Sequence, residues 1–193
     1  MKRYRTRRSP ARVLASLIAP VLVFAGLFII GYSFLIGDPF ASAALFTADA
    51  PRDSTMELTI PEMRHVRDVP VYDGAASDEA ALHDGALHIN STGFPWQQGA
   101  NVYIAGHRLG FPGTKSYLLF WDFDKLQSGD EVILTDANGT RYTYTVFKKF
   151  VTDPTDTSVL EPVPGRNIVS LQTCTLPDYS QRLIVQAELT SVS

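Results

Sequence analysis

The sequence predicts an all-β fold, a closed barrel or a sandwich of about seven or eight short strands, preceded by one N-terminal transmembrane helix. Short runs rich in β-branched and aromatic residues recur after residue 56, and Gly, Pro, Asn and Asp bound them. An apolar, uncharged segment covers residues 13–37. The 193 residues, 45% of them hydrophobic, are enough for one domain with a core of its own.

Residues 1–12 form a basic tail before the apolar segment. The tail contains no acidic residue, and its basic residues are Lys2, Arg3, Arg5, Arg7, Arg8 and Arg12. A helix over 13–37 would be roughly 37 Å long, which is enough to cross the hydrocarbon core of a bilayer. Because basic flanks stay inside, we expect a single-pass cell-membrane protein with a cytoplasmic N-terminus and an extracytoplasmic domain.

A cleaved secretory signal is the alternative for this segment. Small residues at 41–43 and at 48–50 resemble a cleavage site. The apolar segment exceeds the usual core of a signal peptide, about 7–15 residues, and this favours a retained anchor. Both interpretations place the domain outside the cytoplasm.

Basic residues dominate before the apolar segment, and acidic residues dominate after it. The tail holds six of the 17 Lys and Arg residues, so 11 basic and all 20 acidic residues remain for the rest of the chain, a net charge of about −9. This acidic balance argues against nucleic acid as a partner. The basic tail is explained by membrane topology and by anionic lipid.

Residues 38–56 are expected to be an extracytoplasmic linker, since they mix small, polar and Pro residues without periodicity. The domain is expected to cover 57–193. Its strand-like runs are 57–63, 85–90, 100–107, 130–136, 141–152, 167–175 and 182–189.

Local signals refine this pattern. Asn138-Gly139 lies between two alternating runs and predicts a tight hairpin turn, because these residues accept positive φ angles. Two short helices are expected, one over 77–85, with Ser77 or Asp78 as its N-cap and Gly85 as its end, and one over 117–129.

The single cysteine, Cys174, ends the run 167–175 shortly before Pro177. With one thiol, the chain cannot form an internal disulfide. Cys174 is therefore either a small buried hydrophobic residue or a reactive group.

An imidazole is the usual partner of a reactive thiol, and the chain has 4 histidines. His107 follows Gly106 at the end of a strand-like run, where loops present reactive groups, and is the candidate partner. His65 and His83 are expected on the solvated surface. His88 either faces outward from a strand or lines a site.

Arg182 opens the last long run after a short loop. If the strands that carry Cys174 and Arg182 pair as a hairpin, the two side chains lie at one end of the sheet. The guanidinium would then stabilise a thiolate or a developing oxyanion. The alternative is a solvent-facing arginine that pairs with Asp178 or Glu188.

Together these residues resemble the sortases, the cysteine transpeptidases that attach proteins to Gram-positive cell walls or polymerise pilins. The resemblance rests on "SLQTC" followed by Arg182, on "AGHR" about 70 residues upstream, and on the N-terminal anchor. The family usually has Thr where Ser170 stands. Further similar segments extend along most of 57–189. The context of the cysteine is similar to the actinobacterial class E sortases, whereas the longer segment 108–126 leaves a class F-like variant open.

The resemblance implies an eight-stranded β-barrel with His107, Cys174 and Arg182 at one end of a groove. Cys174 would cleave a sorting motif such as Leu-Pro-x-Thr-Gly or Leu-Ala-x-Thr-Gly between Thr and Gly and pass the acyl group to an amine of a cell-wall precursor or a pilin. His107 would transfer protons, and Arg182 would hold the substrate and the oxyanion. Thr173 would position the substrate, and the backbone N–H of Thr175 is a candidate oxyanion donor.

Two rival functions belong to other classes. A domain of this fold would serve as a non-catalytic module that binds cell-wall peptides if Cys174 were merely packed, or as a thiol hydrolase if water resolved the thioester. The resemblance implies no cofactor. The loop carboxylates match no EF-hand spacing and we assign no metal to them; they are Asp122, Asp124, Asp153, Asp156 and Glu161.

Overall fold

The structure is a computed structural model that describes residues 48–193. The expectations for the basic tail, the membrane segment and the first part of the linker lie outside these residues. Among residues 48–193, no helix has the length and apolar character needed to cross a bilayer.

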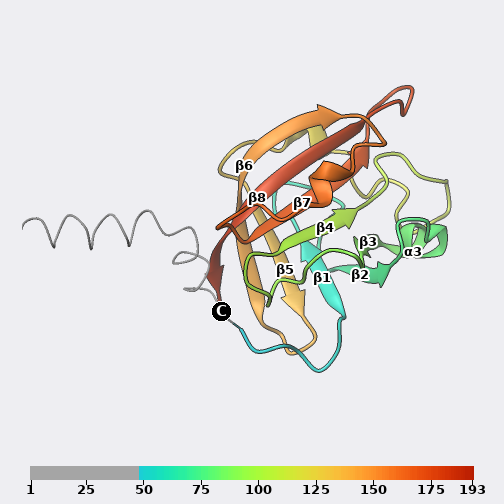
Figure 1. The fold of residues 1–193 in the computed structure, drawn as a ribbon. Helices are drawn as coiled ribbons and strands as arrows, with labels where there is room; N and C mark the ends of the chain where they lie inside the picture. The colour runs from blue at the N-terminus through green and yellow to red at the C-terminus, as the bar shows by residue number, and fades with distance from the viewer. Residues whose placement is uncertain (1–47) are drawn as a thin grey trace, which may run out of the picture.

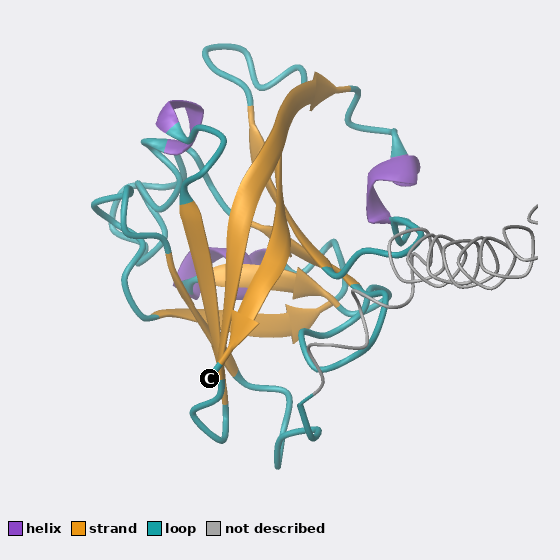
Figure 2. Cartoon of the chain, turned by 90° about the vertical axis from the view of Figure 1, so that its left-hand side faces the viewer, coloured by secondary structure: helices purple, strands orange, loops and turns teal. Residues whose placement is uncertain are grey.

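The described residues form a closed eight-stranded barrel, as predicted, with the strand order β1-β2-β3-β4-β7-β8-β6-β5. Figure 1 shows the strands wrapped around a common interior, and Figure 2 shows the same barrel from the side with short helices at its edges. The elements are β1 (Met56–Thr59), β2 (Val69–Gly74), α3 (Glu79–Asp84), β3 (Ala86–Ile89), β4 (Asn101–Ala105), η1 (Phe123–Lys125), β5 (Glu131–Asp136), β6 (Arg141–Thr152), η2 (Thr157–Leu160), β7 (Ile168–Cys174) and β8 (Arg182–Val192).

Alternating side chains explain the strands. In β6 the buried Tyr142, Tyr144 and Val146 alternate with outward residues, as a half-buried strand requires. The inward residues of the strands meet in one main core, to which Phe120 and Phe123 contribute from outside the sheet. A covered apolar interior of this kind supplies most of the free energy of folding.

The directions of the strands place the end of β4, the end of β7 and the start of β8 at one rim of the barrel. β4 and β7 are parallel, with Ala105 opposite Gln172, so both strands end at the same side. β8 runs antiparallel to β7 and begins with Arg182 directly opposite Cys174. The two strands therefore pair as a hairpin, which is the condition under which the sequence placed Cys174 and Arg182 at one end of the sheet.

Helix α3 covers this side of the barrel between β2 and β3 (Figure 1). The Asp78 side chain accepts a hydrogen bond from Ala81 N at 3.1 Å, and Gly85 follows the last helical residue. The prediction of a short helix over 77–85, with Asp78 as one of its two candidate caps, is confirmed.

The predicted helix over 117–129 is wrong. The chain instead makes successive turns, in which Leu119 N bonds to Ser116 O and Trp121 N bonds to Leu118 O, before η1. Phe120 N donates to the carbonyl of His107 at 2.9 Å, and this tertiary bond replaces a helical one. The turns still direct Phe120 and Phe123 into the core, whereas Trp121 is exposed.

Two smaller differences concern the strands. β2 was not among the predicted runs, because Pro70 and a short mixed sequence obscure it. At the β5–β6 turn, Gly139 has a positive φ of 86° but Asn138 does not, and the Asp136 side chain accepts from Asn138 N at 2.8 Å and Thr140 N at 3.0 Å. The hairpin is present, but Asp136 caps its turn.

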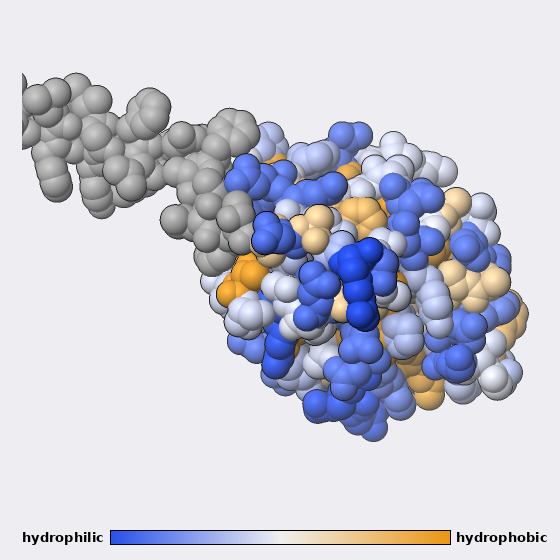
Figure 3. All heavy atoms as spheres, turned by 90° about the horizontal axis from the view of Figure 1, so that it is seen from below, coloured by the Kyte–Doolittle hydropathy of each residue, from blue (hydrophilic) through white to orange (hydrophobic). Residues whose placement is uncertain are grey.

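The end of the predicted linker lies on the barrel. Ala48 packs against the main core, and Arg52 N donates to Asn138 Oδ1 at 3.4 Å. Seen from below, the described surface is mostly hydrophilic, with apolar residues scattered among polar ones (Figure 3). That face shows no broad apolar area for a partner.

Candidate active site

His107, Cys174 and Arg182 line one groove at the barrel rim. The groove has a volume of about 390 Å³, and its floor comes from the ends of β4 and β7. The connection between β6 and β7, including Val159 and Leu160 of η2, forms one wall. The three predicted residues, widely separated in the sequence, are thus brought together.

Backbone bonds fix the two parallel strand ends at this point. Gly106 N donates to Gln172 O at 3.0 Å, which extends the β4–β7 ladder by one residue. The Thr173 hydroxyl donates to Gly106 O at 2.8 Å from a fully buried position. Both backbone polar groups of Gly106 are therefore hydrogen-bonded to β7, and they fix the chain at the point where His107 follows, beside Cys174.

Cys174 is a free thiol, half-buried, and it lines the groove. A merely packed cysteine would lie inside a core cluster, whereas Cys174 belongs to neither core cluster formed by the described residues. Its position is that of a group accessible to a ligand in the groove.

Arg182 is half-buried and faces the groove. Its Nη1 donates to the carbonyls of Tyr179 and Gln181, at 3.3 Å each. Neither carboxylate proposed as its surface partner pairs with it, because Asp178 caps Ser180 and Glu188 pairs with Arg166 at 3.3 Å. The solvent-facing salt-bridge alternative is wrong, and the guanidinium retains donors for a ligand.

His107 has a lowered pKa, chiefly because burial disfavours the charged imidazole. The nearby Glu79 carboxylate opposes this effect and raises the pKa, while His83 lowers it. At neutral pH the imidazole is therefore mostly neutral and able to accept a proton, and Glu79 favours the imidazolium once it forms.

Thr173 and Thr175 make contacts that bear on their expected roles. The Thr173 hydroxyl is used in the bond to Gly106 O, so this residue holds the floor of the groove. The backbone N–H of Thr175 donates to Gln181 O at 3.0 Å within the β7–β8 turn. That N–H would have to give up this bond to act as the expected oxyanion donor, and Arg182 is the other candidate.

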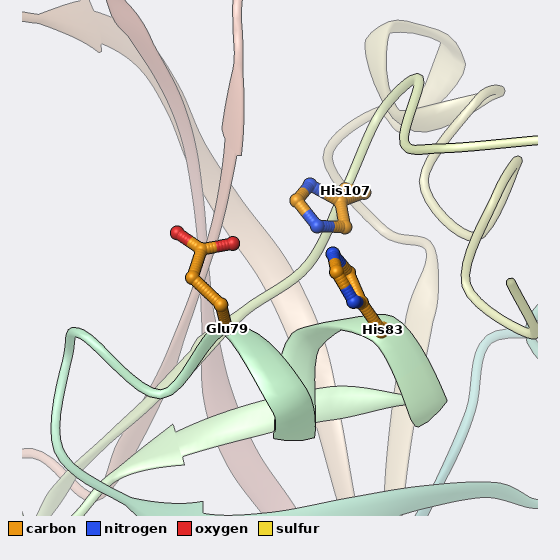
Figure 4. Close-up of side chains that lie close together, drawn as sticks. All are labelled: Glu79, His83 and His107. Carbon is orange, nitrogen blue, oxygen red and sulfur yellow. The ribbon is translucent and has the colours of Figure 1, made fainter.

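The groove also contains residues that the sequence analysis missed. Tyr103 lies under it, its hydroxyl donates to Gln172 Oε1 at 2.7 Å, and burial raises its pKa. Glu79 and His83, on α3, point toward His107 (Figure 4). The spacing of four residues between them, which places both on one helix face, was the available signal.

The positions of His83 and His88 differ from those expected from the sequence, whereas the position of His65 agrees. His65 is exposed, as predicted. His83 is half-buried with its ring centroid 6.1 Å from that of His107, so the expectation of a solvated surface position is wrong. His88 is fully buried and neither faces outward nor lines the groove, because its ring nitrogens contact Asp73 Oδ1 at 2.8 Å and Gly93 O at 3.0 Å.

Four of the five loop carboxylates named above have partners among the described residues. Asp122 is buried and accepts from Arg64 Nε at 3.1 Å and Lys125 Nζ at 2.7 Å. The other contacts are Asp124 with Arg108, Asp153 with Thr155, and Asp156 with Ser158 and Thr152.

Comparison with known proteins adds to this geometry. The family model described as "Sortase domain" matches residues 58–190. A curated relative, "Sortase A" of Streptococcus agalactiae serotype III (strain NEM316), is 32% identical over 134 residues, which are 68% of this chain and 51% of the relative. The chain thus spans about half the length of this relative.

Solved structures show the same similarity. Sortase E from Streptomyces avermitilis is 33% identical with a TM-score of 0.60, and the match covers 75% of this chain and 93% of that one. Sortase A from Corynebacterium diphtheriae is 28% identical with a TM-score of 0.62, and the match covers 75% of this chain and 64% of that one. The barrel fold is therefore shared with these two sortases.

Proposed function

The chain belongs to the sortase family, and from that premise we propose that it is a membrane-anchored cysteine transpeptidase with Cys174 as its nucleophile. The observation that carries the proposal is the convergence of His107, Cys174 and Arg182 on one groove, with Cys174 and Arg182 paired directly across β7 and β8. In acyl transfer through a thioester, a thiol supplies the nucleophile, an imidazole transfers the protons, and a guanidinium can stabilise the oxyanion.

Acylation begins with the Cys174 thiol and the sorting peptide. The sulfur attacks the carbonyl carbon of the Thr–Gly bond while His107 takes the thiol proton. The oxyanion that forms is stabilised by the Arg182 guanidinium, whose fork of donors suits a developing negative charge. The C–N bond then breaks, His107 gives its proton to the leaving amine, and a thioester remains on Cys174.

Deacylation repeats these steps with a second amine. His107 takes a proton from the incoming amine as it attacks the thioester carbonyl. The C–S bond then breaks, and His107 returns this proton to the sulfur to restore the Cys174 thiol. The thioester conserves enough free energy for a new amide bond to form without ATP. This suits the extracytoplasmic location that we propose for the domain.

The substrates we propose are secreted proteins with a sorting motif of the Leu-Pro-x-Thr-Gly or Leu-Ala-x-Thr-Gly type, and the acceptor is an amine of a cell-wall precursor or a pilin. The 33% sequence identity with the sortase E from Streptomyces avermitilis, over a match that covers 93% of that chain, supports a class E-like assignment. The groove wall formed by Val159 and Leu160 offers an apolar surface for the Leu side chain of the motif.

The test uses the full chain in detergent with a panel of Leu-x-x-Thr-Gly peptides, with and without a panel of amines. We expect amide products that depend on the amine and are lost in both Cys174→Ala and His107→Ala, since the first removes the nucleophile and the second the proton carrier. His65→Ala is the matched control, because His65 is an exposed histidine that does not line the groove.

Other outcomes would identify the rival functions. Products made only by water, at the same rate with and without amines, would make the protein a thiol hydrolase. Tight peptide binding with no cleavage, together with resistance of Cys174 to a small alkylating reagent, would make it a binding module. Either result would contradict the transpeptidase proposal.

A further inference from the structure

The structure places three metal-ligating side chains together at the edge of the groove. Glu79 and His83 lie on one face of α3, and His107 follows β4 (Figure 4). One ligand atom of each residue lies within 4.8 Å of those of the other two. We propose that these residues form an inhibitory site for a divalent transition-metal ion, with Zn²⁺ as its occupant.

One ring nitrogen of each imidazole lacks a hydrogen-bond partner among the described residues. Nε2 of His83 and Nε2 of His107 are both buried and neither makes a hydrogen bond with the described residues. A buried nitrogen without a partner costs free energy, because water no longer satisfies it. A metal ion bound between the two rings would satisfy both atoms at once.

The distances suit a site that closes on its ion. Ligands of a tetrahedral zinc ion, at about 2.0–2.2 Å from the metal, lie roughly 3.3 Å from one another. The ligand atoms lie at most 4.8 Å apart, so they would approach one another by no more than about 1.5 Å on binding. Glu79 is exposed and has a long side chain, so rotation of its carboxylate supplies much of this movement.

The donor set selects the metal. Two imidazole nitrogens and one carboxylate suit Zn²⁺ and leave an open coordination position, whereas Ca²⁺ and Mg²⁺ prefer several oxygen ligands. The Phe111 ring lies edge-on to both imidazoles, at centroid distances of 5.2 Å from His83 and 6.3 Å from His107. The site adds a metal to a chain for which the sequence predicted none.

Occupancy would interrupt the proposed catalysis, and this part of the inference rests on the proposed function. An imidazole nitrogen that is bound to a metal cannot accept or donate the proton that acyl transfer requires. Glu79 and His107 also line the groove, so the ion would lie where the sorting peptide binds. Zn²⁺ would therefore act as a reversible inhibitor that is removed by a chelator.

Binding is tested without any need for activity. The tag-free full chain in detergent, carrying Cys174→Ala so that the thiol cannot bind metal, is titrated with ZnCl₂ by calorimetry. We expect one Zn²⁺ per chain, affinity lower by about tenfold or more in His83→Ala and in Glu79→Gln, and unchanged affinity in the matched control His65→Ala. Ca²⁺ and Mg²⁺ should produce no saturable heat. Absence of Zn²⁺ binding, or an affinity that His83→Ala leaves unchanged, would overturn the site.

Inhibition is tested separately on the chain with Cys174 intact. Each protein is compared with its own metal-free rate, so that any effect of a substitution on turnover is removed. We expect Zn²⁺ to slow thioester formation, EDTA to restore it, and the inhibitory concentration to rise by about tenfold or more in His83→Ala. Equal inhibition of His83→Ala and the parent would place the inhibitory ion elsewhere, for example on Cys174, and would contradict the proposal. If no peptide is turned over but the calorimetric result holds, the proposed function fails while the metal site stands.

Discussion

Gly106 is the position where one methyl group should disturb both the core and the site. A Cβ added there would lie 2.7 Å from Cε2 and 2.9 Å from Cδ2 of Phe120, whereas carbon atoms in contact are about 3.5–4.0 Å apart. The Phe120 ring is fully buried and stacks on Phe123 at a centroid distance of 5.0 Å. It cannot move aside without disturbing its neighbours, so the strand end that precedes His107 must shift instead.

The size of the effect follows from this clash. Overpacking a core costs about 1–3 kcal/mol, which for a domain of this size lowers Tm by about 2–12 °C. A shift of His107 by about 1 Å would reduce turnover by about 10²-fold. We therefore expect Gly106→Ala to fold with a lower Tm and a lower free energy of unfolding, and to lose most of its activity. Thermal unfolding, urea unfolding and the peptide assay measure these three changes.

A double-mutant cycle isolates the cause. Phe120→Leu removes the ring atoms nearest to the new methyl group, so Gly106→Ala should cost about 1 kcal/mol less in the Phe120→Leu background than in the parent. Two results would refute the reasoning: Gly106→Ala with parental stability and turnover, or additive losses in the double variant.

Three further predictions concern the oxyanion, acid stability and the anchor. Arg182→Lys keeps the charge but loses the planar fork, so alkylation of Cys174 should persist while turnover falls by about 10²-fold, and parental turnover would remove Arg182 from the mechanism. Hydrogen bonds from Lys125 and Arg64 lower the pKa of Asp122 to about 2. The ionised carboxylate therefore stabilises the fold above about pH 4, and this contribution is lost as the pH falls toward the folded pKa. Between about pH 5 and pH 2.5, the free energy of unfolding should therefore fall by about 1–2 kcal/mol less in Asp122→Asn than in the parent, a figure discounted because the two cations are exposed. An identical fall in parent and variant would contradict this. If residues 13–37 are a retained anchor, the mature protein should resist extraction from membranes by high salt or alkali, and a mature N-terminus near residue 44 would show cleavage instead.

The strands were predictable because their signal is local. Alternation in β6 and the β-branched runs of β5, β7 and β8 repeat the burial pattern that the barrel imposes. The residues 117–129 show the limit of local reasoning, since the bond from Phe120 N to His107 O comes from a distant segment and prevents a helix. β2 depends similarly on its pairing with β1 and with β3, and its own residues indicate little.

The site was predictable to the extent that it lies at strand ends. Cys174, Arg182 and His107 follow from where three runs end or begin, together with the pairing of β7 and β8. Glu79 and His83 were missed because the position of α3 beside the groove depends on the chain path between β2 and β3. The pairing of Thr175 N with Gln181 O depends on the conformation of the β7–β8 turn, which no pattern in the sequence specifies.

The central claim is that Cys174 carries the acyl group between two amines, and intact-mass spectrometry of the full chain tests it most directly. The protein is mixed with a Leu-Pro-x-Thr-Gly or Leu-Ala-x-Thr-Gly peptide without an amine, quenched in acid, and digested to locate the adduct. The account predicts an added mass equal to the peptide up to Thr, located on Cys174, absent in Cys174→Ala, and lost on addition of an amine as the amide product appears. Amine-dependent amide formation by Cys174→Ala, or an acyl group on any other residue, would contradict it.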